Sequence, residues 1–151
     1  MRAISRLLIV VICLSVSGCS INRATGTFDP GKDLVNSDIF YVERFAPDKR
    51  ELNKTIADGI NVRGYTATFG PAGEAPDDAT VIVTYVDKWM WDITNYMIEL
   101  TITFRDPESG AALGSGNSYH TSLTRLSPEE MIEEVLTNIF SADTGEEPAE
   151  G

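Results

Sequence analysis

Histidine and cysteine are scarce in this chain, which has one histidine, His120, and two cysteines, Cys13 and Cys19, among 151 residues. Protein zinc sites are built mainly from cysteine and histidine, and serine hydrolases pair the nucleophile with a histidine base. The acidic pairs 77–78 and 106/108 follow no EF-hand pattern and suit turns. The sequence therefore predicts no catalytic residues, no metal ligands and no cofactor.

Basic residues are also few, since 12 Lys and Arg stand against 23 Asp and Glu for a net charge of −11. An acidic chain is a poor match for the phosphate backbone, so no nucleic-acid partner is expected. From residue 127 onward there are acidic residues and no basic ones: Glu129, Glu130, Glu133, Glu134, Asp143, Glu146, Glu147 and Glu150. A solvated helix face followed by a soluble tail explains this run, and a docking segment for a basic partner is the alternative.

No apolar run reaches the ~20 residues that a membrane-spanning helix needs. The longest, residues 7–14, follows Arg2 and Arg6 and precedes small residues, which is the three-part pattern of a cleaved secretion signal. Val16-Ser17-Gly18-Cys19 then resembles the lipobox of bacterial lipoproteins. An ordinary secretory signal that contains a cysteine by chance is the alternative.

The lipobox resemblance implies removal of residues 1–18 and acylation of Cys19, with palmitate among the usual chains, so that the membrane is a partner through this lipid. Ser20 stands where aspartate would signal retention, and this resembles the enterobacterial pattern for the outer membrane, facing the periplasm. Loss of Arg2 and Arg6 leaves 10 basic and 23 acidic residues, a net charge of −13. With Cys13 removed and Cys19 acylated, no disulfide is expected.

Three segments are predicted after the signal. Residues 19–36 are polar and broken by glycine and proline, which favours a lipidated tether that would span ~23 Å if flexible. Residues 37–140 have the apolar periodicity of one folded domain, and residues 141–151 have little to bury and are expected to form a disordered acidic tail.

The first half of the domain predicts strand, helix, loop and strand. Residues 38–45 are rich in aromatic and β-branched side chains, and Asp48 with Glu51 suits a capping box for a helix that Gly64 would close. Residues 66–79 are expected to be loop, and residues 80–86, apolar on both faces, to form an interior strand.

The second half carries the clearest alternation, in which four residues point toward the core: Ile98, Leu100, Ile102 and Phe104. A turn at residues 106–110 should return the chain into a strand over 112–121, whose Gly114 and Gly116 suggest a sheet edge. Ser127 and Glu130 then predict a capping box for a final helix.

The expected order, β-α-β-β-β-α, predicts an α+β two-layer sandwich, with a four-stranded mixed sheet and two helices on one face. Gly64-Tyr65, Asp78-Ala79 and the 106–110 hairpin within this order resemble a domain-of-unknown-function family of small bacterial lipoproteins. The layout also looks like small domains of outer-membrane assembly lipoproteins, an analogy that does not fix function.

Large aromatic side chains gather around residues 85–96. The predicted binding patch consists of Tyr85, Trp89, Met90, Trp91 and Tyr96. Tyr85, Trp89 and Trp91 share a parity along an extended segment, so they point to one face. Three interpretations stay open, namely that the rings close the end of the core, that they recognise a protein or glycan partner, or that they contact lipid headgroups.

Two functions follow. The first is a non-enzymatic binding or assembly module, lipid-anchored at the inner leaflet of the outer membrane, with an unknown envelope protein or polymer as partner. The second is an envelope-polymer hydrolase that uses carboxylates and His120. A polar cleft joining His120 to an acid would favour the hydrolase, and an exposed aromatic patch would favour binding.

Overall fold

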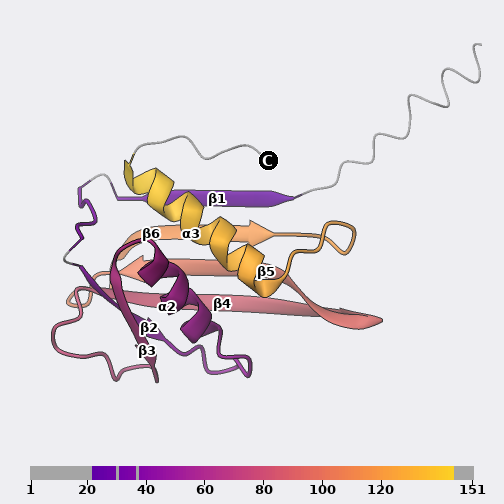
Figure 1. Ribbon diagram of the computed structural model, residues 1–151, viewed down its shortest axis with the longest axis horizontal. Helices are drawn as coiled ribbons and strands as arrows, with labels where there is room; N and C mark the ends of the chain where they lie inside the picture. The colour runs from indigo at the N-terminus through magenta and orange to yellow at the C-terminus, as the bar shows by residue number, and fades with distance from the viewer. Residues whose placement is uncertain (1–21, 30, 37, 145–151) are drawn as a thin grey trace, which may run out of the picture.

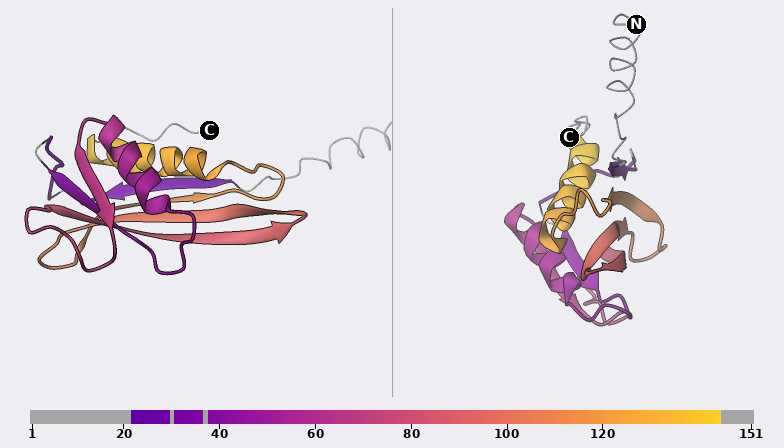
Figure 2. Two further views of the ribbon diagram at one scale, coloured as in Figure 1. Left: turned by 60° about the horizontal axis from the view of Figure 1, so that its bottom comes forward. Right: turned by 90° about the vertical axis from the view of Figure 1, so that its right-hand side faces the viewer.

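The computed structural model describes residues 22–29, 31–36 and 38–144, so the predicted leader, Cys19 and residues 145–151 lie outside the described residues. Two helices lie on one face of a six-stranded sheet (Figures 1 and 2). The elements are β1 (Arg23–Phe28), β2 (Ile39–Glu43), α2 (Leu52–Val62), β3 (Thr66–Gly70), β4 (Val81–Asp92), β5 (Thr94–Arg105), β6 (Ala112–Tyr119) and α3 (Pro128–Thr144). Within these ranges, no helix has the length and apolar character that crossing a membrane requires.

The sheet is mixed, with strand order β1-β6-β5-β4-β2-β3. Strand β2 is parallel to both β3 and β4, and the other pairs are antiparallel. Helix α2 packs on β2 and β3, whereas α3 packs on β1, β6 and β5. The predicted α+β class is therefore correct.

The predicted strand count of four is wrong because the sequence reasoning missed both edge strands. Strand β3 occupies residues that were expected to be loop, and β1 occupies residues that were expected to be tether. Both are short and mostly exposed, so neither has an apolar alternation of its own. Their backbone N–H and C=O groups form hydrogen bonds with a neighbouring strand, and the pattern of side chains in the sequence does not predict such pairing.

Much of the predicted tether, residues 19–36, belongs to the domain. Residues 23–28 pair along β6, and the Leu34 side chain lies in the hydrophobic core at 8% exposure. The Leu34 N–H donates to the Asp143 carboxylate at 3.1 Å. Asp143 belongs to α3, which runs to Thr144 and so includes the start of the predicted tail. Three residues, 20–22, therefore separate Cys19 from the first strand.

The core face of β5 follows the predicted alternation up to a bulge. Leu100, Ile102 and Phe104 are fully buried. The register against β4 shifts so that Lys88 pairs with Glu99 and Trp89 with Met97, which leaves Ile98 without a partner on β4. Met97 is therefore buried in place of Ile98, because a bulge reverses the side-chain parity beyond it.

Glycines let α3 lie close to the sheet. A Cβ built on Gly116 would come within 2.9 Å of the Ile139 and Val135 side chains, and one on Gly26 would collide with the Asn138 backbone. Gly116 thus serves close helix packing, whereas a Cβ on Gly114 would meet the Phe28 ring of β1. Strand β6 is an interior strand between β1 and β5 instead of the predicted edge.

Candidate functional site

The five residues of the predicted binding patch do not form one surface, because some are buried and others are exposed. Tyr85 is 3% exposed and belongs to the hydrophobic core. Its hydroxyl donates a 2.6 Å hydrogen bond to the carboxylate of Asp48, which is itself buried. Tyr85 therefore joins β4 to the segment before α2 and contributes no accessible binding surface.

Asp48 does not form the predicted capping box, because Glu51, with φ 58°, occupies the N-cap position without a side-chain cap. The Asp48 carboxylate accepts backbone N–H bonds from Arg50 and Leu52 at 2.6 and 2.8 Å. Burial raises the pKa of Asp48, but the hydrogen bond from Tyr85 and these two N–H bonds outweigh it and leave the pKa below its usual value. Burial, followed by the bond to Asp48, raises the pKa of Tyr85.

Trp89 is half-buried and packs against the core. The Arg50 guanidinium lies 3.7 Å from its ring centroid, and its indole N–H donates to Asp87. These contacts support the interpretation that this ring closes the end of the core.

Met90, Trp91 and Tyr96 lie farther along the β4–β5 hairpin. Met90 pairs with Tyr96 and so shares its face, while Trp91 has the parity of Trp89 and points to the opposite face. Tyr96 is half-buried, with the Arg125 guanidinium 4.0 Å from its ring centroid. Met90 is 49% and Trp91 73% exposed, so these two keep the accessible surface that the prediction required.

Two exposed apolar residues at the same end were missed. Ile93 forms the hairpin turn at 88% exposure with φ 62°, and Leu123, in the β6–α3 loop, is 90% exposed. Each is a single aliphatic residue with polar residues on both sides, and this sequence pattern could have predicted an exposed apolar side chain. The tip surface is defined here as Met90, Trp91, Ile93 and Leu123.

His120 is joined to an acid, as the hydrolase hypothesis requires, but inside the protein. Its Nε2 lies 2.9 Å from Oε2 of Glu134, the Ser118 hydroxyl donates to the same oxygen, and Nδ1 has no partner. Ser118 is fully buried and His120 is 6% exposed. Because the carboxylate lies between serine and histidine, the imidazole does not contact the hydroxyl as a serine triad requires, and the cluster ties β6 to α3. Nor does the described part of the chain hold three or more potential metal ligands in one group.

The acidic side chains of α3 border a shallow groove of about 600 Å³. Its lining residues are Glu129, Glu130, Glu133, Glu134, Thr137 and Asn138. Ser127 and Glu130 form the predicted capping box through bonds of 2.7 and 3.2 Å, which lower the pKa of Glu130. Glu133 pairs with Arg63 at 2.6 Å. Glu130, Glu133 and Glu134 thus have structural partners on or near the helix.

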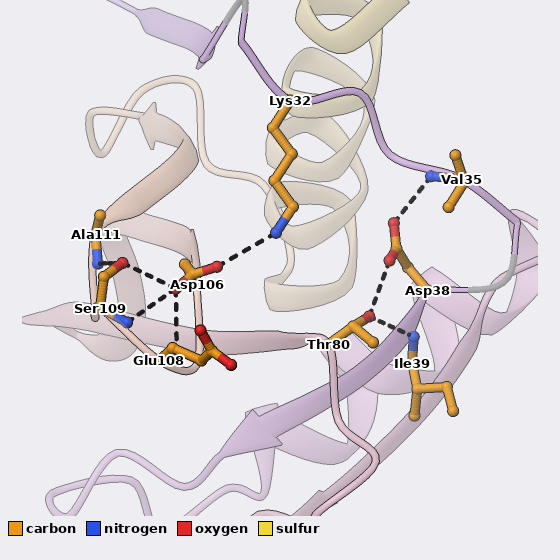
Figure 3. A network of polar contacts seen from close by, with 9 residues as sticks. All are labelled: Lys32, Val35, Asp38, Ile39, Thr80, Asp106, Glu108, Ser109 and Ala111. Atoms are coloured by element: carbon orange, nitrogen blue, oxygen red, sulfur yellow. Dashed lines mark hydrogen bonds and ion pairs between the residues drawn. The ribbon is translucent and has the colours of Figure 1, made fainter.

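The acidic residues of the 106–110 turn also have a structural role (Figure 3). Asp106 accepts from the Ser109 N–H and hydroxyl at 2.8 Å, and these bonds, with a 3.4 Å contact to Lys32, lower its pKa to about 2. Asp38 similarly accepts from Val35 N–H and the Thr80 hydroxyl at 2.9 Å. Both networks hold the segment after β1 against the sheet.

The face of the sheet opposite the helices carries a row of hydroxyl side chains. Pairing registers place Thr27, Ser115, Thr103 and Thr84 side by side on β1, β6, β5 and β4. The next row contains Thr25, Asn117 and Thr101. Both helices lie on the other face in Figure 2, so the described helices leave these rows uncovered. These seven residues are called the open face.

No family model matches the chain, and no curated protein matches it in sequence. Solved structures match its fold. A PelC dodecamer from Paraburkholderia phytofirmans aligns with TM-score 0.60 and 14% identity over 79% of this chain and 98% of that one. TolB from Acinetobacter baumannii aligns with TM-score 0.50 and 14% identity over 82% of this chain but 32% of that one. A PDZ domain protein from Parabacteroides distasonis aligns with TM-score 0.50 and 9% identity, covering 91% and 39%. This fold thus occurs both as nearly a whole chain and as part of longer proteins.

Proposed function

We propose that this protein is a lipid-anchored envelope lipoprotein whose domain is a non-enzymatic binding or assembly module. The anchor is the acylated Cys19 of the lipobox Val16-Ser17-Gly18-Cys19, and the proposed location is the periplasmic face of the outer membrane. The observation that carries the binding role is the open face, a hydroxyl and amide surface that spans four strands.

The chemistry of the open face suits a polar envelope polymer rich in hydroxyl groups. Serine and threonine hydroxyls both donate and accept. The Asn117 Nδ2 donates to Glu99 and Thr101 within the protein, so this side chain offers its carbonyl oxygen as an acceptor. The Thr103 and Ser115 hydroxyls lie 3.1 Å apart, and the Ser115 hydroxyl donates to the Ile102 carbonyl at 3.2 Å, so both hydroxyl oxygens keep acceptor capacity for a ligand. A surface of this kind binds an extended chain without enclosing it, in keeping with a module that holds or organises envelope material.

Assembly with other copies is a further element of the proposal, supported by the fold likeness to a chain that forms a dodecamer. The hydrolase alternative receives no equivalent support. His120 and Ser118 are buried, and Glu134 lies between them.

The anchor is tested by feeding cells labelled palmitate. Wild type should take up label and partition into detergent, and Cys19→Ala should do neither. Lipid labelling of the alanine variant would contradict the anchor assignment.

The binding role is tested with a photo-crosslinking side chain at Thr101 on the open face, in cells that make the full chain. Val62 at the end of α2 is the matched control position, since it is 86% exposed and away from that face. Polymer or protein captured at Thr101 but not at Val62 supports the module. Equal capture at the two positions would contradict it.

A further inference from the structure

The N-terminal end of β1 and the tip of the β4–β5 hairpin lie at the same end of the sheet. Arg23 pairs with Tyr119, Tyr119 with Glu99, and Glu99 with Lys88, so these four residues form one row across the sheet. From this row the hairpin continues toward Ile93, past the ends of β6 and α3 (Figure 1). Strand β1 runs in the same direction as β5, so Arg23, its first residue, lies at this end too.

The lengths of these two extensions match. Ile93 is five residues beyond Lys88, which places it roughly 16 Å from the row at about 3.3 Å per residue. Cys19 is four residues before Arg23 and reaches at most about 14 Å from the same row. With the strands upright on the membrane, a lipid on Cys19 therefore lets the hairpin tip reach the bilayer surface.

The side chains at this end are those that suit a lipid interface. Four of the eight exposed large apolar residues in the described chain form the tip surface, Met90, Trp91, Ile93 and Leu123. The loop that carries Leu123 is tied to the start of β1, because the Thr124 hydroxyl donates to Asn22 at 2.5 Å. Tryptophan is enriched at membrane–water interfaces, where its ring enters the headgroup layer.

The charges at the tip are paired with one another. Arg125 contacts the Asp92 carboxylate at 3.2 Å and the Thr94 hydroxyl at 3.0 Å. The mature chain has a net charge of −13, so anionic lipid offers no general attraction. Contact with the bilayer would therefore depend on apolar burial and would not require acidic headgroups.

The hairpin turn adds an independent observation. Ile93 adopts φ 62°, a region that glycine and asparagine occupy readily and that is strained for a β-branched residue. The turn thus keeps a large apolar side chain at its most exposed point in spite of a backbone conformation that disfavours it.

We propose that the tip surface docks on the lipid bilayer that holds Cys19, as a second membrane contact beside the lipid anchor. Docking orients the domain with the long axes of β4 and β5 toward the membrane and leaves the open face at the side, accessible to a partner. This inference rests on the proposed acylation of Cys19.

The test uses the full lipidated chain in phosphatidylcholine vesicles, after mass spectrometry of its N-terminal peptide has established the lipid. A single cysteine at Ile93, or separately at Leu123, carries an environment-sensitive fluorophore, and Val62→Cys is the control because its exposure, 86%, matches the 88% of Ile93. We expect a blue shift, and quenching by lipids with brominated acyl chains, at Ile93 and Leu123 but not at Val62. Leu123 keeps the test informative if the change at Ile93 disturbs the hairpin.

The outcomes separate the anchor from the docking. If the lipid is present but all three probes stay water-exposed in vesicles, docking is wrong and the anchor stands. Protection that occurs in native envelopes but not in protein-free vesicles assigns the tip surface to a protein partner and overturns lipid docking. Absence of lipid on Cys19 overturns both proposals. Equal signals with and without phosphatidylglycerol would support the apolar mechanism, and a strict requirement for the anionic lipid would overturn it.

Discussion

Both halves of β4 carry large apolar side chains, but their surroundings differ. Val81, Val83 and Tyr85 are 0%, 0% and 3% exposed, whereas Met90 and Trp91, later in the same strand, are 49% and 73% exposed. The first half lies in the part of the sheet that the helices cover, and the second half extends beyond their ends (Figure 1). Burial along β4 is therefore decided by the layer that covers each part and not by the side chains of the strand alone.

The largest effect should come from a charge on the covered part. Ile102 is fully buried and pairs with Tyr85 on β4. Ile102→Asp should cost several kcal/mol, comparable with the whole stability of a small domain, and should unfold the protein. Thr103→Asp, on the open face, is the matched control and should stay folded in circular dichroism melts. Similar melting temperatures for the two variants would contradict the assignment of Ile102 to the buried face of β5 and Thr103 to the open face.

A smaller effect is expected from the hydrogen bond that joins the covered half of β4 to the segment before α2. Tyr85→Phe removes the hydroxyl that donates to Asp48, and loss of a bond to a buried charged group costs roughly 1.5 to 3 kcal/mol. The depressed pKa of Asp48 means that its ionised form stabilises the fold above the unfolded pKa of about 3.9, and that this contribution is lost as pH falls through the lower folded value.

Urea unfolding of wild type and Tyr85→Phe across pH measures this effect. The difference in stability between them should be largest near neutral pH and should shrink as the solution becomes more acidic than pH 4. A difference that is independent of pH would mean that the hydroxyl acts through packing and not through the carboxylate.

The smallest losses of stability are expected from replacing Trp89 and Trp91, and they should differ between these two residues. Trp89→Ala should cost about 1 to 2 kcal/mol, because the ring packs on the core and under Arg50. Trp91→Ala should melt within a degree or two of wild type, because the ring is 73% exposed. Differential scanning calorimetry of both variants makes the comparison. An equal, large loss for Trp91→Ala would place that ring in the core as well.

Short stretches of sequence determined several strands and one helix start of this protein. The alternation at Leu100, Ile102 and Phe104, the interior strand that follows residue 80 and the Ser127–Glu130 capping box could all be predicted, since each depends on neighbours within a few residues. The lipobox is likewise a local signal, and the acylation of Cys19 that it predicts awaits the labelling experiment.

The tertiary structure decided what depends on distant partners. Edge strands β1 and β3 exist through pairing with β6 and β2, and the bulge at Ile98 moved Met97 to the core face. The aromatic residues that share one short segment of sequence were separated because the helix layer ends partway along β4, a boundary set by where α2 and α3 pack. The residue pattern of β4 fixes which side chains share a face, but only the packing of other elements on that face decides which of them meet water.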